Sequence, residues 1–378
     1  MGRSVTAADE SEDPGDTSHA RDRYSRAQAG LLTIRNPRLD ARYLLSLIRA
    51  LAGRRVVVVG DAVADAFVYG RVMRVSREAP VLILEHDSTD IVPGGAGNAA
   101  NNVAALGGRV TLVTVIGRDE TGRRLVAALH PRVSRGRLLR TAARPTPVKT
   151  RILAGDVHSA KQQIVRIDHA VDPWPDSQIR STFARRALDA ILGADAVIVS
   201  DYGLGLITPK LVARMRKAFE DARLRVPLLI DTRHKLLNYR GLTACTPNES
   251  EVEQALGVQI DDNRRALERS GRALLSRTQM EAVLITRGSR GMALFVRGVP
   301  TVHIPIFGSD EIVDVTGAGD TVMASVALAL AAGASFEAAA RLANYAGGLV
   351  VMKRGTATVT AEELFRAVHN DARVAGAT

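Results

Sequence analysis

Hydrophobic positions near the start of the chain follow first a helical and then a strand-like spacing. Residues 39–53 (LDARYLLSLIRALAG) place apolar side chains at helical intervals and end at a glycine, and residues 54–61 (RRVVVVGD) form a β-branched run. Apolar residues at i, i+3 and i+4 are typical of an amphipathic helix, and a short β-branched run is typical of a buried strand. The sequence therefore predicts a helix followed by a first buried strand.

Two further segments are rich in β-forming residues but also polar. Residues 67–87 and 148–168 have this character, with glycine and proline between the apolar patches of the first. They predict strands of a small, exposed sheet. Between them, residues 94–108 (GGAGNAANNVAALGG) predict a loop that leads into a helix, and residues 109–117 (RVTLVTVIG) predict another buried strand.

After Pro173 the chain alternates between helical and strand-like segments. The predicted helices cover residues 176–194, 208–225, 249–257 and 272–280, and the predicted strands cover residues 195–203, 226–231, 243–248 and 281–288. Such alternation implies crossover units and a parallel sheet. The predicted fold class is α/β, with a mostly parallel central sheet flanked by helices and a small β-sheet lid. Ligands bind at the carboxyl ends of such strands, where the sequence places Asp61, Asp201, Asp231, Asn248 and Arg287.

Composition limits the class of protein. The 378 residues, 46% of them hydrophobic, suffice for two or three domains or for one large α/β unit. The first 30 residues contain no apolar block, so we expect residues 1–38 to be a disordered tail and neither a secretory signal nor an anchor. No uncharged run is long enough to span a membrane, and the single Cys245 excludes a disulfide framework. A cytoplasmic protein is expected.

The net charge of +11 raises the question of nucleic-acid binding. The basic residues are mostly arginines scattered along the chain, whereas a nucleic-acid site gathers them in one patch. We therefore expect no nucleic-acid partner and no membrane partner. A basic surface favours an anionic, phosphorylated small substrate.

Two of three glycine-rich stretches are weak candidates for a phosphate site. Residues 117–124 (GRDETGRR) have the glycine spacing of a Walker loop but lack its Lys-Ser or Lys-Thr ending, which indicates a turn before a helix. Residues 95–100 (GAGNAA) fit a dinucleotide pattern. They follow a polar, proline-containing stretch, residues 88–94, instead of a clean buried strand, so the strand-turn-helix context that this pattern requires is expected to be missing. A dehydrogenase is therefore disfavoured.

The third stretch, residues 314–333 (DVTGAGDTVMASVALALAAG), opens directly into an apolar helix. Unpaired N–H groups and the helix dipole attract anions at such a terminus. Asp320 lies in the same turn, either as an N-capping residue or as a base. Phosphoryl transfer to an alcohol needs an anion cradle and a proton acceptor close together, and this loop could supply both.

The pairing of PGGAGNAANNVAALGG with VDVTGAGDTV resembles the ribokinase or PfkB carbohydrate kinase family. The stretches GDAVADAFVYGRVMRVSREAPV, VKTRIL, QQIVRID, SDYGLG, TPNESE and LITRGSRGMALF add to the likeness, which covers residues 54–360 and is greatest for the heptose 7-phosphate kinase branch. The resemblance implies a ribokinase-like kinase domain over residues 39–366, with lid segments 67–92 and 148–171 and a C-terminal tail 367–378. We therefore expect this sequence to lack the nucleotidyltransferase domain that is fused to the kinase in many bifunctional relatives.

The resemblance also implies roles for single residues. Asp320 would be the general base, and the N–H groups of Gly317, Ala318 and Gly319 would form the anion hole. The residues expected to hydrogen-bond the sugar are Asp61, Asp65, Gly94, Gly95 and Asn98. For Asp65 a solvated turn carboxylate is the alternative. Lys149, Arg151 and Arg166 would grip a substrate phosphate, or else lie on a solvated sheet face.

On the nucleotide side, the resemblance implies an ATP site formed by Asp201, Asn248, Glu251, Thr286, Gly288 and Asn344. Glu251 would hold Mg²⁺ through water. Asn248 and Glu251 also have the spacing of a helix cap with its capping-box partner, and both interpretations can hold. Asn344 is either near the adenine or satisfies a neighbour. Asp314 is either structural or near a monovalent cation such as K⁺.

The resemblance implies an ATP-dependent sugar kinase that takes a sugar phosphate and forms a homodimer through its lid sheets. Two departures affect the nucleotide side: Leu204 stands where the heptose branch has a lysine, and DTRH, with Arg233, replaces DPKG. Arginine restores the charge but not the geometry of an ammonium. A kinase for another sugar or a nucleoside, and a non-catalytic sugar- or nucleotide-binding protein, remain alternatives.

Overall fold

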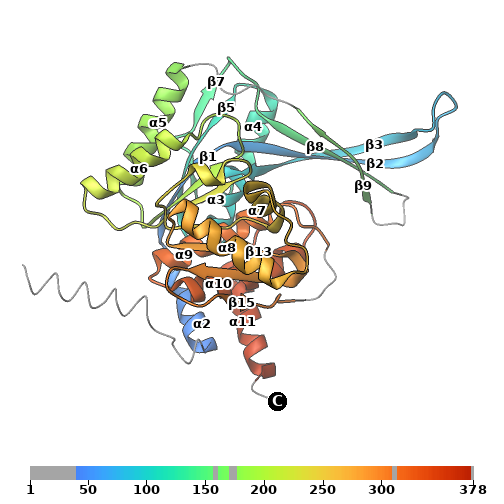
Figure 1. The fold of residues 1–378 in the computed structure, drawn as a ribbon. Coiled ribbons are helices and arrows are strands. Elements are labelled where there is room, and N and C mark those ends of the chain that lie inside the picture. Colours follow the sequence, from blue (N-terminus) through green and yellow to red (C-terminus); the bar gives the residue numbers. More distant parts are fainter. Residues whose placement is uncertain (1–39, 156–160, 170–176, 309–312, 376–378) are drawn as a thin grey trace, which may run out of the picture. The chain divides into compact units, whose positions relative to one another are not determined.

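The computed structural model describes residues 40–155, 161–169, 177–308 and 313–375, and its largest sheet is mostly parallel. β13 to β14 and β14 to β15 are the antiparallel pairs. The α/β prediction is therefore confirmed (Figure 1). In spatial order the strands are β15 (Val302–Ile304), β14 (Met292–Val296), β13 (Ala282–Thr286), β12 (Ala244–Cys245), β11 (Leu228–Thr232), β10 (Ala196–Asp201), β1 (Arg55–Gly60), β4 (Arg109–Val113) and β6 (Val133–Ser134).

Both faces of this sheet are covered, which explains the continuous apolar runs of its strands. In β1, Val57 and Val59 join one apolar cluster with side chains of α5 (Ser177–Ile191), α6 (Pro209–Asp221), α7 (Glu249–Leu256) and α8 (Arg264–Thr278). The other face carries α3 (Ala96–Ala105), α9 (Ala318–Ala331) and α10 (Phe336–Val351). α9 is buried on nearly all sides, as its apolar, small-residue sequence requires.

A second, four-stranded sheet extends away from these layers (Figure 1). Its order is β3 (Leu82–Gly95), β2 (Ala62–Val75), β8 (Val148–Gly155) and β9 (Gln162–Asp168), with β2 and β8 parallel and the other pairs antiparallel. These strands contain most of the predicted lid segments. Residues 156–160, 170 and 171 of the second segment lie outside the described residues.

The end of β3 leads into the GAGNAA stretch. Residues 88–94 belong to this strand, in which only Pro93 and Gly94 of that stretch are buried, and it passes directly into α3, so β3 is not the clean buried strand of a dinucleotide pattern. Polar residues and Pro93 are tolerated because β3 is an edge strand of the exposed sheet. Gly95, at the junction, has φ 57°, and a Cβ there would lie 2.5 Å from the Asp61 carbonyl oxygen.

The remaining elements complete the chain. α2 (Ala41–Ala50) packs against α11 (Ala361–Ala375), which continues past residue 366, where we placed the end of the kinase domain. α4 (Glu120–Ala127), capped by Asp119, begins inside residues 117–124, so a short turn does lead into a helix there. The other elements are β5 (Val115–Gly117), β7 (Leu139–Thr141), η1 (Leu236–Asn238) and η2 (Gly288–Arg290). None of the described helices is both long and apolar enough to span a membrane. The predicted tail, residues 1–38, lies outside the described residues.

Candidate active site

A cavity of about 370 Å³ lies beyond the carboxyl ends of β10, β11 and β13, between them and the first turn of α9. Its position is the one expected for a ligand site of a parallel sheet. Nine predicted site residues line it: Asn248, Glu251, Thr286, Gly288, Gly317, Ala318, Gly319, Asp320 and Asn344.

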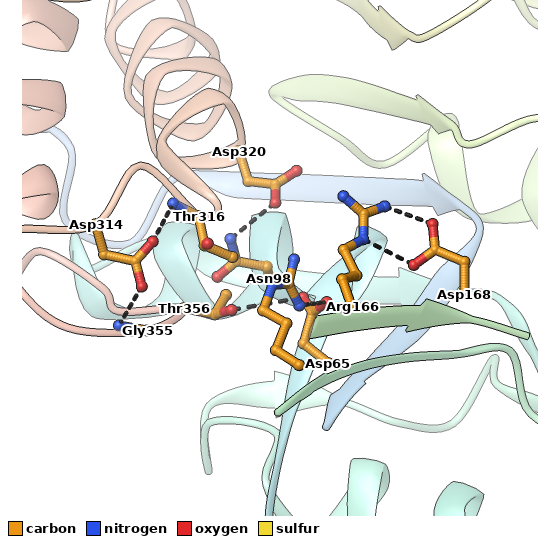
Figure 2. Close-up of polar contacts among 10 residues, drawn as sticks. Asp65, Asn98, Arg166, Asp168, Asp314, Thr316, Asp320, Gly355 and Thr356 are labelled. Carbon is orange, nitrogen blue, oxygen red and sulfur yellow. Dashed lines mark hydrogen bonds and ion pairs between the residues drawn. The ribbon is translucent and has the colours of Figure 1, made fainter. Parts of the chain in front are cut away.

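Asp320 is the central acidic group of this cavity. It is the third residue of α9, whose N-cap is Gly317, so the N-capping interpretation of Asp320 is wrong. Its side chain is buried, and its Oδ2 accepts a hydrogen bond of 2.8 Å from Asn98 Nδ2 (Figure 2). Tyr202 Oη donates to Oδ1 at 3.4 Å. Burial, reinforced by Asp231, raises the pKa of Asp320 to about 8, which is suited to proton abstraction.

The glycine loop before Asp320 offers N–H groups to an anion. Gly317 has φ 79°, which favours glycine, and a Cβ there would lie 2.5 Å from Asn98 Nδ2. The Ala318 N–H donates to the Val315 carbonyl at 3.2 Å. Within the described residues the N–H groups of Gly317 and Gly319 have no acceptor. Two of the three predicted anion-hole donors are thus available in this structure.

Asp65 lies in the lid sheet beside the base. Its Oδ1 accepts a 2.6 Å hydrogen bond from Arg151, and Thr356 Oγ1 lies 3.5 Å from its Oδ2. Both side chains of the Asp65–Arg151 pair are nearly buried, so Asp65 is not a solvated turn carboxylate. Gly94 is packed on Asp65, because a Cβ at Gly94 would lie 2.3 Å from Asp65 Oδ2.

The other two lid cations differ in their surroundings. Arg166 is exposed and pairs with Asp168 through two hydrogen bonds of 2.7 and 2.5 Å (Figure 2). Lys149 is half-buried, and its Nζ lies 4.9 Å from the centroid of the Tyr202 ring. Lys149 is therefore the one of the three without a carboxylate hydrogen bond within the described residues.

Asp61 and Asp201 lie behind the loop that follows β10 and are outside the cavity lining. Asp61 Oδ2 accepts from the N–H groups of Tyr202 and Leu204 at 3.0 and 3.2 Å. Asp201 accepts from the Gly203 N–H, Thr232 and Tyr239. Both carboxylates thus hold the loop. Their contacts with sugar and ATP stay predictions.

Asn248 and Glu251 form a capping box at the start of α7, with both reciprocal hydrogen bonds 2.9 Å long. Burial raises the pKa of Glu251 to about 7. No three His, Cys, Asp or Glu side chains gather into a metal site in the part of the chain that the structure describes. The Glu251 carboxylate and Asn248 amide are oxygen donors of the kind that Mg²⁺ takes, directly or through water.

Two further predicted polar residues have structural partners. Asn344 lines the cavity while its Nδ2 donates to the Pro305 carbonyl at 2.9 Å, so the amide satisfies a neighbour. Asp314 joins two loops, since its oxygens accept from the N–H groups of Thr316 at 2.8 Å and Gly355 at 3.0 Å (Figure 2).

The lining of the cavity combines polar and apolar residues, as a nucleotide-binding site requires. The buried Thr246 hydroxyl lines it without a hydrogen-bond partner in the described residues. An apolar portion adjoins the glycine loop and accommodates an aromatic ring, with lining residues Met292, Ile306, Val315, Val322, Gly347 and Val351.

Comparison with known proteins decides the family. Residues 54–363 match the pfkB family carbohydrate kinase. This chain belongs to the pfkB family. The pfkB protein is 40% identical over 332 residues to the bifunctional protein HldE of Trichlorobacter lovleyi, covering 87% of this chain and 66% of that relative. It is 42% identical to HldE of Caulobacter sp. strain K31, covering 87% and 65%. The chain therefore spans just under two thirds of the length of these relatives.

Solved structures confirm that this pfkB protein has the ribokinase-like fold. Arabidopsis thaliana ribokinase complexed with ribose and ATP matches with a TM-score of 0.65 at 23% identity, covering 84% of this chain and 99% of that chain. Phosphofructokinase-2 from Escherichia coli in complex with fructose-6-phosphate matches with a TM-score of 0.65 at 16% identity and the same coverage.

Sequence reasoning did not assign Tyr202 to the pfkB site. Tyr202 follows directly on β10 in the SDYGLG stretch, and that position after a strand was the available signal. Asp231 and Arg233, noted only as a strand-end acid and a substituted cation, also line the cavity. The apolar residues on its nucleotide side carry no local signal, because they resemble any core positions.

Proposed function

We propose that this chain is a cytoplasmic, ATP-dependent kinase that phosphorylates the anomeric hydroxyl of D-glycero-β-D-manno-heptose 7-phosphate. The product would be the 1,7-bisphosphate, for nucleotide-sugar biosynthesis of the ADP-heptose type. Membership of the pfkB family supports a sugar kinase. The heptose-branch motifs and the similarity to HldE proteins support the substrate.

The observation that carries the proposal is the buried Asp320 beside the free N–H groups of Gly317 and Gly319. Asp320 accepts the proton of the sugar hydroxyl, whose oxygen forms a bond to the γ-phosphorus of ATP as the bond to ADP breaks. The glycine N–H groups stabilise the negative charge on the transferred group. Bound Mg²⁺ supplies charge neutralisation on the phosphates, and Glu251 would hold it through water.

The sugar side of the proposal uses the lid. Asp65 and Asn98 face the region of Asp320 and can hydrogen-bond sugar hydroxyls, since carboxylates and amides pair well with polyols. Arg151 and Arg166 approach from the second lid segment and would bind the 7-phosphate at the expense of their pairs with Asp65 and Asp168.

The lid sheet also supports the homodimer. Eight large apolar side chains on or beside its strands are exposed: Val72, Met73, Val75, Val81, Leu82, Ile164, Val165 and Ile167. Pairing of two such sheets would cover these side chains and the free edges. Light scattering after size exclusion should give twice the mass of the 40.4 kDa chain. A monomer at micromolar concentration would contradict this part of the proposal.

The decisive test is ADP release by Asp320→Asn with heptose 7-phosphate and ATP. We expect the wild type to turn over and the variant to lose turnover by at least about 100-fold, because the base is gone. Near-normal turnover of the variant would remove Asp320 as the base. Parallel assays with fructose 6-phosphate, ribose and nucleosides separate the heptose from other acceptors. If all acceptors fail while ATP still raises the melting temperature, a non-catalytic binding protein gains support.

A further inference from the structure

The ring of Tyr202 contacts two cations from different parts of the fold. Lys149 Nζ lies 4.9 Å from the ring centroid, and the guanidinium carbon of Arg233 lies 4.6 Å from it. Lys149 belongs to β8 of the lid sheet, whereas Tyr202 and Arg233 follow β10 and β11 of the central sheet. Three segments distant in sequence thus bring two positive charges to one aromatic ring, which attracts cations through its π face.

Neither of these cations has a direct carboxylate partner in the part of the chain that the structure describes. Within the described ranges, the side chains of Lys149 and Arg233 make no hydrogen bond and no ion pair. The neighbouring Arg151, by contrast, is paired with Asp65 at 2.6 Å. Burial, and next the charge of Arg233, lower the pKa of Lys149 to about 8. Two nearby like charges disfavour each other, so an anion that contacts both side chains would be favoured and would stabilise the charged form of Lys149.

This pair of cations lies beside the proposed base. Tyr202 Oη is 3.4 Å from Asp320 Oδ1, and Tyr202, Arg233 and Asp320 all line the same cavity. An anion at the two cations would therefore lie next to the place where Asp320 takes a proton. The glycine N–H groups at the start of α9 open onto the same cavity.

The loop that carries Tyr202 is fixed from behind. Asp61 accepts from the N–H groups of Tyr202 and Leu204, and Arg144 donates to the Leu204 carbonyl at 3.3 Å. The loop position where the resemblance implies a lysine holds the uncharged Leu204. Positive charge on this side of the cavity therefore has to come from Arg233 and from the lid.

We propose that Lys149 and Arg233 bind the phosphoryl group while it is transferred, and that Tyr202 is the positioning residue that holds both cations beside Asp320. This inference rests on the proposed kinase function. As the sugar oxygen bonds to phosphorus and the bond to the ADP oxygen breaks, charge spreads over the equatorial oxygens, where two cations stabilise it. Because Lys149 is part of the lid, the phosphoryl site is complete only when the lid is in place.

The first experiment needs no sugar. Melting temperatures are measured for the wild type, Lys149→Met, Arg233→Met and the lid control Arg71→Met, whose arginine pairs with exposed carboxylates. Each is measured with MgADP, and with MgADP plus aluminium fluoride, which mimics the phosphoryl group in transfer. We expect all four to respond to MgADP, and only the wild type and Arg71→Met to gain a further shift of several degrees with aluminium fluoride. A retained further shift in both test variants, or none in the wild type, overturns the inference.

The second experiment measures kcat and KM with heptose 7-phosphate. Lys149→Met and Arg233→Met should each lose about 100-fold in kcat with KM for ATP changed less than about threefold, because a contact made only in transfer affects kcat. Tyr202→Leu should lose about tenfold or more in kcat, and Tyr202→Phe, which keeps the ring, should recover part of that loss. If the wild type turns over but both cation variants keep its kcat, the inference fails while the kinase function stands. If the wild type phosphorylates no sugar, the kinase proposal fails. The aluminium fluoride shift then still decides whether Lys149 and Arg233 bind a phosphoryl-like group.

Discussion

Asn98 Nδ2 lies 2.8 Å from Asp320 Oδ2, although the two residues are 222 positions apart in the chain. Asn98 belongs to the first turn of α3 and Asp320 to the first turn of α9, and the two helices pack on the same face of the central sheet. The amide favours the ionised carboxylate and so lowers the pKa of Asp320, against the larger effect of burial. Asn98 therefore sets both the orientation and the basicity of the proposed base.

Asn98→Ala should shift the pH dependence of catalysis. Because Asp320 must be ionised to act as a base, and its pKa is about 8, kcat/KM of the wild type should fall as the pH drops through about 8. Loss of a hydrogen bond to a charged group, about 1.5–3 kcal/mol, should move that midpoint up by about one to two pH units. Profiles of kcat/KM between pH 6 and 10 measure it.

Asn101→Ala is the matched control, since Asn101 also belongs to α3 and hydrogen-bonds residues 128 and 130 instead of the base. Its midpoint should equal that of the wild type. An equal shift in both variants would mean that α3 as a whole, and not the Asn98 amide, controls the titration.

Asp320→Asn should change how stability depends on pH. The pKa of Asp320 is raised from 3.8 to about 8, so its contribution to folding is fully present below about pH 4 and is lost as the pH rises through about 8. The variant cannot ionise and escapes this loss. Its free energy of unfolding should gain on that of the wild type by on the order of 1 kcal/mol per pH unit between about pH 5 and 7.

Urea unfolding at several pH values tests this difference. Asp61 and Glu251 also have raised pKa values, but they are common to both proteins and cancel in the comparison. Parallel stability curves for the two proteins would show that Asp320 is solvated and carries an ordinary pKa.

Two glycines of one loop should respond in opposite ways to alanine. Gly317 has φ 79° and lacks room for a Cβ, whereas at Gly319, inside α9, a Cβ would meet no atom within 4 Å. Gly317→Ala should destabilise by about 1–3 kcal/mol through strain. Gly319→Ala should stabilise by about 0.5–1 kcal/mol, because alanine favours the helix. Thermal unfolding without ligand measures both, and equal effects would contradict the loop geometry.

The Asp65–Arg151 pair should behave as a nearly buried ion pair, with side chains only 9% and 12% exposed. Arg151→Met leaves an unpaired carboxylate and should cost about 3 kcal/mol, and Asp65→Leu in the same background should recover most of it. The exposed Arg71→Met should stay within about 0.5 kcal/mol of the wild type. A double-mutant cycle by urea unfolding measures the coupling. Additive costs would show that the two groups do not interact.

The alternation of periodic segments was enough to predict the α/β class, the small exposed sheet and the loop before α9. These features depend on local spacing, which the sequence contains. The last residues of β3, beyond the predicted lid segment 67–92, were not predicted as strand, because Pro93 becomes acceptable there only when the exposed edge of a sheet is known. The sequence left two interpretations of Asp320 open, an N-capping residue and a base. Only the structure, in which Gly317 is the N-cap of α9, excludes the first.

Long-range side-chain relations were beyond the sequence. Nothing local indicates that Lys149 and Arg233 meet at Tyr202, since these three residues come from strands far apart in the chain. Likewise, the N–H groups that donate to Asp61 and Asp201 belong to the loop after β10, and the conformation of that loop is not evident from the sequence. The residue types were informative, and their pairing was decided by tertiary packing.

β3 passes directly into α3 at Gly95, so the lid sheet is connected to α3 without an intervening loop. β3 forms one edge of the second sheet, and Asn98 stands three residues beyond its last residue. Because no flexible linker separates them, a displacement of the strand is transmitted to the amide that holds Asp320. In the proposed kinase, the covalent chain itself would therefore couple a movement of the lid strand to the orientation of Asp320.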